Sequence, residues 1–158
     1  MMINRNKHFE QEFQGAIDRG FTLIELLITM VIIGILASIA LGSFQQYVLK
    51  SRRIDATTTL MKLAVAQEKY FNQHLTYSND ISSSSGLNQQ SLLSDESYYQ
   101  LSVEVKIQAA DGIDSFKVSA TAISSQSKDK QCQLFSINHL NVQQAFNSQN
   151  TINSDCWL

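Results

Sequence analysis

The chain has 158 residues, a formal net charge of −2 and 44% apolar residues. This length allows one modest domain with an appendage, and the slightly negative charge argues weakly against nucleic acid as an obligatory partner. The apolar residues gather near the N-terminus, and the remainder of the chain is rich in Ser, Gln and Asn.

An apolar run from Phe21 to Leu41 contains a single charged residue, Glu25. As a helix it spans about 30 Å, the thickness of the hydrocarbon core of a bilayer. This predicts a retained membrane helix. A secretory signal peptide is the alternative, because the segment Ala37-Ser38-Ile39-Ala40 contains a potential small-residue cleavage site, although signal peptides have a shorter apolar stretch. Basic residues flank the run equally and leave its orientation open: Arg5, Lys7 and Arg19 before it, and Lys50, Arg52 and Arg53 after it.

Glu25 lies five residues into this run, and an ionisable residue inside a spanning segment indicates a function. No basic residue within the apolar run offers it a partner. The nearest candidate cation is a free α-amino group on Phe21, which exists only if the chain is cut before that residue. The alternative is a carboxylate that is merely tolerated near the membrane interface.

The heptapeptide from Gly20 to Leu26, GFTLIEL, follows Arg19. It closely resembles the processing site of type IV prepilins and of the related pseudopilins of type II secretion. The resemblance implies that a prepilin peptidase cuts between Gly20 and Phe21 on the cytoplasmic side and N-methylates Phe21. It also implies that Glu25 pairs with the Phe21 amine of a neighbouring subunit during assembly, although residues i and i+4 of one helix also allow an intramolecular pair.

The helix is predicted to continue beyond the membrane to about Phe71, because the chain contains no proline and this stretch consists of good or neutral helix formers. The apolar positions of its second half recur on one face. They are Ala56, Leu60, Leu63, Ala64 and Phe71. We therefore expect one helix of roughly 50 residues, on the order of 75 Å long, with an amphipathic second half.

Downstream of this helix, a serine-rich connector and a short helix around residues 89–94 are expected. Alternation of apolar and polar residues then predicts strands, with a turn at Asp111-Gly112. The expected strands are Tyr99–Ile107, Phe116–Ala122, Gln133–Ile137 and Val142–Phe146. The predicted fold is α+β, a long N-terminal helix packed on a small antiparallel sheet, and it agrees with the layout of pilins.

Cys132 and Cys156 are the only cysteines. If this part of the chain lies outside the cytoplasm, the pair should be oxidised, and the bond would stabilise the fold by roughly 3–4 kcal/mol. The ending Asp155-Cys156-Trp157 resembles the disulfide-bounded region of small minor pilins. A metal-binding pair with His74 and His139 is the alternative, although the CxxC spacing typical of such sites is missing.

The sequence contains none of the common hydrolase, metalloprotease or phosphate-loop motifs, so we expect no enzyme, catalytic residue, metal or cofactor. The resemblance implies a minor pilin, a structural subunit of a type IV pilus that supports adhesion, twitching motility or DNA uptake. Its expected partners are other pilin subunits, the prepilin peptidase and the inner-membrane assembly platform. It would lie in the inner membrane with its N-terminus in the cytoplasm and then in the extracellular fibre.

Three segments are expected: a leader of residues 1–20, a hydrophobic assembly segment of residues 21–43 and a soluble globular domain of residues 44–158. Two alternative functions stay open, a type II secretion pseudopilin and a ligand-binding or DNA-binding minor pilin. For the latter, the candidate surface is a small basic patch of Lys128 and Lys130, with Lys106 and Lys117 as candidate neighbours. The sequence favours the alternative, in which these lysines belong to a solvated loop.

Overall fold

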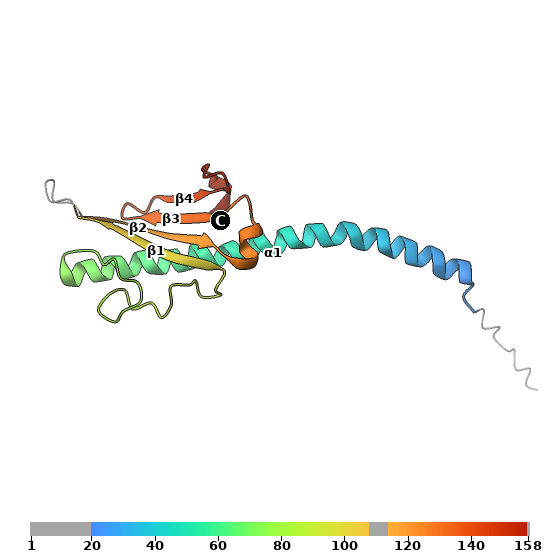
Figure 1. Cartoon of the computed structure of the whole chain (residues 1–158), viewed down its shortest axis with the longest axis horizontal. Coiled ribbons are helices and arrows are strands. Elements are labelled where there is room, and N and C mark those ends of the chain that lie inside the picture. Colours follow the sequence, from blue (N-terminus) through green and yellow to red (C-terminus); the bar gives the residue numbers. More distant parts are fainter. Residues whose placement is uncertain (1–19, 108–113, 158) are drawn as a thin grey trace, which may run out of the picture. The chain divides into compact units, whose positions relative to one another are not determined.

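The computed structural model describes residues 20–107 and 114–157, which form one long helix and a four-stranded sheet (Figure 1). This confirms the predicted α+β class. In chain order the elements are the helix α1 (Leu23–His74), the strands β1 (Tyr99–Lys106) and β2 (Ser115–Ala122), the 3-10 helix η1 (Ser124–Lys128), the strands β3 (Leu134–Asn138) and β4 (Gln143–Phe146), and the 3-10 helix η2 (Ser154–Cys156).

The chain divides into two compact units between Ile39 and Ala40. In the first unit every described residue, from Gly20 to Ile39, is exposed. An 18-residue window of α1 near the N-terminus has a mean hydropathy of 2.6, and none of it is buried by the rest of the chain. By length and composition, α1 is therefore able to cross a membrane.

The second unit contains the rest of α1, and there the predicted apolar face is confirmed except at Phe71, which is half-buried and stacks on Tyr77 with ring centres 4.7 Å apart. Ala56, Leu60 and Leu63 are buried in the core, and Ala64 packs against it. The helix has 52 residues, close to the expected length, and ends at His74 because Leu75 adopts the left-handed conformation with φ 58°. That end lies three residues beyond the predicted one.

The sheet has the strand order β1-β2-β3-β4, and each pair of neighbours is antiparallel. One row of paired residues crosses all four strands, from Leu101 through Ala120 and Phe135 to Ala145. All four side chains are buried, and they belong to the same core cluster as Leu60. The predicted apolar face of the sheet and the buried face of α1 therefore form one core.

The prediction of a short helix around residues 89–94 is wrong. This segment lies along β1, where Leu93 forms a bridge with Gln100 and the Leu101 N–H donates to the Leu92 carbonyl at 2.7 Å. The Asp55 carboxylate on α1 also accepts a hydrogen bond from the Ser94 hydroxyl at 2.5 Å. These long-range bonds take the place of the i to i−4 bonds of a helix.

The strand boundaries differ from the predicted ones by one residue at several ends. β1 ends at Lys106, so Ile107, which was expected on the buried face, lies beyond the strand and is 71% exposed. β3 extends to Asn138, whose side-chain carbonyl accepts hydrogen bonds from the N–H groups of Leu140 and Val142 and so forms the turn to β4. The predicted turn at Asp111-Gly112 lies outside the described residues.

Candidate functional site

The predicted processing and assembly residues lie at the start of α1. Gly20 and Phe21 precede the helix, and Glu25 lies in its first turn. The Thr22 hydroxyl accepts a hydrogen bond from the Glu25 N–H at 3.2 Å, as an N-cap residue does. Thr22 and Glu25 also have the spacing of a capping box. This role of Thr22 was not predicted, although the spacing of Thr22 and Glu25 in the sequence indicates it.

The Glu25 carboxylate is exposed, and no basic side chain of residues 20–107 or 114–157 forms an ion pair with it. Phe21 is 85% exposed. The sequence places both residues at one end of the helix, but no bond joins them among the described atoms. At this end of α1 the Glu25 carboxylate and the Phe21 ring are therefore accessible to molecules other than this chain.

A buried polar cluster fixes η1 against α1 in the second unit. The Arg53 guanidinium donates to both Asp129 carboxylate oxygens, at 2.7 and 3.0 Å, and both side chains are less than 10% exposed. The Gln126 amide donates to the Leu49 carbonyl and to the Tyr99 hydroxyl, each at 3.0 Å. Burial raises the pKa of Tyr99, so its hydroxyl stays neutral at ordinary pH. None of this cluster was predicted.

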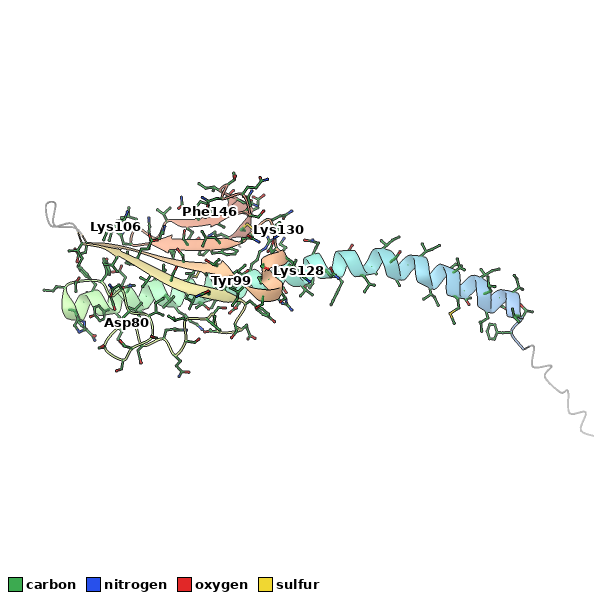
Figure 2. The ribbon with its side chains drawn as sticks, viewed as in Figure 1. Asp80, Tyr99, Lys106, Lys128, Lys130 and Phe146 are labelled. Atoms are coloured by element: carbon green, nitrogen blue, oxygen red, sulfur yellow. A yellow bond between two sulfur atoms is a disulfide. The ribbon has the colours of Figure 1, made fainter. Side chains whose placement is uncertain are left out.

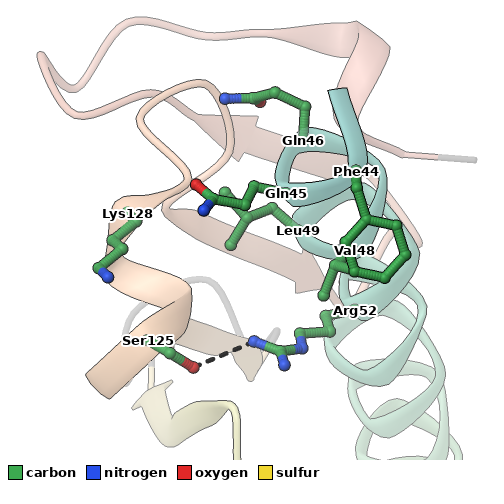
Figure 3. Close-up of a pocket in the computed structure, with 8 residues that line it drawn as sticks. All are labelled: Phe44, Gln45, Gln46, Val48, Leu49, Arg52, Ser125 and Lys128. Atoms are coloured by element: carbon green, nitrogen blue, oxygen red, sulfur yellow. Dashed lines mark hydrogen bonds between the residues drawn. The ribbon is translucent and has the colours of Figure 1, made fainter. Parts of the chain in front are cut away.

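An open groove lies between α1 and η1 and has a volume of about 360 Å³ (Figure 3). Arg52 on α1 and Lys128 on η1 are its charged residues. Arg52 is held in place, because its Nη1 donates to the Ser125 hydroxyl at 3.1 Å and its guanidinium carbon lies 4.3 Å from the centre of the Tyr98 ring.

The structure contains the predicted Cys132–Cys156 disulfide, with a Cα–Cα distance of 5.8 Å. Because both sulfur atoms take part in this bond, a metal-binding pair is not supported. Hydrogen bonds also hold the tail, since the Ser148 N–H donates to the Lys130 carbonyl at 2.9 Å. The Trp157 ring packs edge-on against the Phe135 ring in the core, with ring centres 6.0 Å apart. Packing and hydrogen bonds therefore hold the C-terminal tail in place together with the disulfide.

The lysines that were considered as one basic patch lie at two ends of the sheet. Lys128 and Lys130 lie at the η1 end, and Lys106 lies at the opposite end (Figure 2). The register explains this, because Tyr99 at the start of β1 pairs with Ala122, the residue that leads into η1, whereas Lys106 is seven residues or about 23 Å further along the strand. Lys117 Nζ lies 3.4 Å from a Glu104 carboxylate oxygen, which offsets its charge. Lys106 and Lys117 therefore do not extend the patch of Lys128 and Lys130.

Two family models match the chain. A model described as "Type IV minor pilin ComP, DNA uptake sequence receptor" matches residues 42–136, more than half of the chain. A model described as the prokaryotic N-terminal methylation motif matches residues 17–41, which include Gly20, Phe21 and Glu25. The two matches meet near the boundary between the two compact units.

Similar proteins are pilins and fimbrial proteins. The type IV major pilin protein PilA of Myxococcus xanthus is 45% identical over 39% of this chain and 28% of its own length. A fimbrial protein of Neisseria meningitidis is 28% identical over 77% of this chain and 67% of its own length. The chain thus matches less than a third of the Myxococcus protein. A solved type IV pilin from Shewanella oneidensis has a TM-score of 0.41 and 26% identity, and the match covers 60% of this chain and 89% of that one.

Proposed function

The chain belongs to the family of type IV minor pilins described as ComP, DNA uptake sequence receptor, and on this premise we propose that it is a minor structural subunit of a type IV pilus. The observation that carries the proposal is the first unit, an apolar helix in which every described residue is exposed. Such a surface requires lipid or other apolar helices around it. A membrane before assembly and a bundle of pilin helices after assembly meet this requirement in turn.

Processing at Gly20 is the first step of the proposal. A prepilin peptidase would remove residues 1–20 on the cytoplasmic side of the inner membrane and methylate the new amine of Phe21. Residues 21–43 would then serve as the membrane and assembly segment, and residues 44–158 as the exported domain. The methylation-motif match over residues 17–41 supports this division. The inner-membrane assembly platform is the partner that would extract the processed chain.

Glu25 supplies the charge for assembly in this proposal. Cleavage would create a cationic amine at Phe21, and a lone charge among apolar helices is costly unless an opposite charge lies close to it. Within the described residues Glu25 has no ion-pair partner, so it is available to the amine of a neighbouring subunit. Because each pair joins one chain to the next, it would fix the axial register of the fibre.

The test is to look for the chain in sheared pili and to measure the mass of its N-terminal peptide. We expect a mature chain that begins at methylated Phe21. Replacing Gly20 by Val should leave the uncut chain in the membrane and out of the fibre, since a bulky residue would keep the peptidase from the backbone. The matched control is Gly20→Ala, which keeps a small residue and should be processed far better. Mature protein from Gly20→Val, or fibres that lack the wild-type chain, would contradict the proposal.

DNA binding is a second candidate function, favoured by the description of the matched family. Lys128 and Lys130 are its candidate contacts, because they lie together and are exposed. Fluorescence anisotropy of a labelled duplex with the full processed chain in detergent would test it. Binding through phosphates should weaken as salt rises, and Lys128→Gln/Lys130→Gln should reduce that salt dependence. Binding that neither salt nor this variant affects would speak against the candidate.

A further inference from the structure

In the second unit, α1 keeps one face exposed along its length. Six exposed residues on this face follow one another at alternating steps of four and three residues, which is the spacing of the a and d positions of a coiled coil. The four large apolar residues among them are 43–71% exposed. We call the six residues the seam. Its members are Tyr47, Ser51, Ile54, Thr58, Met61 and Val65.

The seam lies on the side of α1 opposite the core. Leu49, Ala56 and Leu63 recur every seven residues and are buried, and around a helix they lie on the other side from the seam. The described part of the chain therefore leaves the seam uncovered. An exposed helix face is ordinarily polar or charged, so a row of large apolar side chains indicates a contact with another helix. The seam ends at Val65, because Glu68 occupies the next position.

A hollow of about 390 Å³ lies on the seam and has an acidic border. Three of the four charged residues around it are acidic, and one of them, Glu96, is exposed and forms no ion pair with residues 20–107 or 114–157. The occupant of the hollow should therefore bring a cationic group together with an apolar helix face. The charged residues around the hollow are Arg52, Asp55, Asp95 and Glu96.

A second copy of the chain has this combination. When two identical helices pair in parallel along a and d positions, a g residue of one lies beside the e residue five positions later in the other. Lys50 is such a g residue, and Asp55 is the matching e residue. Lys50 is exposed and has no ion-pair partner in the described part of the chain. Because a symmetric contact repeats each pair, two Lys50–Asp55 pairs would form.

Anchoring in one membrane fixes the direction of this partner. Two copies inserted in the same way have parallel helices, as the Lys50–Asp55 pairs require. The a and d positions before the seam are apolar as far back as Leu23, so the contact can continue into the membrane segment. We propose that two copies of the chain pair in register along the seam while they wait in the membrane. The inference rests on the proposed membrane anchoring.

This pairing differs from the contact proposed for the fibre. Glu25 and Phe21 are four residues apart, so a bond between Glu25 and the Phe21 amine of a neighbour shifts two adjacent helices by about 6 Å along their axes. A shift of this size separates the identical residues that meet when two seams pair in register. The paired seams must therefore part before assembly, and until then each covers the apolar face of the other.

The experiment uses the full chain in liposomes that contain no assembly machinery. Tyr47→Cys and Ile54→Cys each place a thiol on the seam, and an oxidant then joins two copies in which the same residue meets itself. The matched control is Gln46→Cys, because Gln46 is also exposed but points about 100° away around the helix. Cys132 and Cys156 are already joined and buried. We expect both seam variants to give at least about tenfold more covalent dimer than the control, since a disulfide requires Cα atoms within about 7 Å.

The charge pairs are tested in the Ile54→Cys chain. Lys50→Glu would face Asp55 of the second copy with a like charge, and it should lower the yield of dimer about fivefold. Lys69→Glu makes the same change of charge at an exposed position beyond the seam and should leave the yield unchanged. Neither lysine forms an ion pair with any described residue, so folding should be unaffected in both variants.

Equal amounts of dimer from Gln46→Cys and Tyr47→Cys would indicate random collision and overturn the inference. Dimers that form only in assembled fibres, or only with a different pilin, would also overturn it, because the seam would then have another occupant. A yield that Lys50→Glu does not change would contradict the pairing in register. Failure of the chain to enter liposomes would contradict the anchoring and this inference with it. Absence of the chain from sheared pili would contradict the proposed function but leave a dimer in liposomes standing.

Discussion

The two units of the chain place their apolar residues in opposite ways. From Gly20 to Ile39 every residue is exposed, although the stretch is almost wholly apolar. In the second unit, apolar residues from α1 and from all four strands are buried together in one core. The buried apolar residues of the second unit are thus explained by contacts within the chain. The apolar residues of the first are explained only by surroundings that the chain itself does not provide.

The carboxylates show the same contrast. Asp129 is 3% exposed and bonded twice to Arg53, so its charge is satisfied by folding. Glu25 is exposed and unpaired among the described residues, so folding does not explain its charge. Changes at Asp129 or Arg53 should therefore alter stability, and a change at Glu25 should alter assembly.

The largest effect on stability is expected from Arg53→Leu. It leaves Asp129 as a buried charge without a partner, which typically costs about 3–5 kcal/mol. Denaturant unfolding of the full chain in detergent, followed by the fluorescence of Trp157, would measure it. The double variant Arg53→Leu/Asp129→Leu should be less destabilised than the single one, because no lone charge remains. An unfolding midpoint equal to that of the wild type would contradict the role of this pair.

Removing the disulfide is expected to lower the free energy of unfolding by a similar or smaller amount. Cys132→Ser and Cys156→Ser should each cost about 2–5 kcal/mol, and the double variant should be no worse than either single one because the same bond is lost. Since hydrogen bonds and Trp157 also hold the tail, we expect the lower half of that range. Unfolding curves and limited proteolysis measure the effect, and membrane insertion should not change. Two free thiols in denatured wild-type protein would show that Cys132 and Cys156 do not form a disulfide and would contradict this prediction.

A still smaller effect concerns alkaline pH. Burial raises the pKa of Tyr99 above its ordinary value of 10.0. The unfolded chain therefore releases this proton first, and stability that is full below pH 10 falls as the pH rises further. Tyr99→Phe should reduce this fall while costing about 1 kcal/mol at neutral pH, because the bond from Gln126 is lost. If the free energy of unfolding falls equally steeply above pH 10 in the wild type and in Tyr99→Phe, Tyr99 does not cause this loss of stability.

Periodicity was sufficient to predict most of the fold. The 3.6-residue spacing of Ala56, Leu60 and Leu63 predicted the buried face of α1, and the four strands were predicted within one residue at their ends. The Arg53–Asp129 pair could not be predicted, because its members are 76 residues apart and neither carries a local pattern. The segment around Leu93 was mistaken for a helix because its bonds to β1 are long-range.

The candidate assembly site was predicted from a motif, and the fold adds to it only the cap at Thr22. Its proposed partner is another chain, so neither periodicity nor the internal contacts of this chain determine the pairing. The pairing of Glu25 with the Phe21 amine of a neighbouring subunit stays a prediction. A test of this pairing also tests the contrast between the two units.

Glu25→Gln is expected to have the smallest effect on the fold and to test the central claim most directly. The measurement is the amount of the chain in sheared pili relative to the membrane, together with its N-terminal sequence and its unfolding midpoint. We predict a chain that still begins at Phe21, an unchanged midpoint, and a fibre content lowered at least about tenfold, because the amine of a neighbour would lack its counter-charge. Normal incorporation of Glu25→Gln, or a loss explained by a lower unfolding midpoint, would contradict the account.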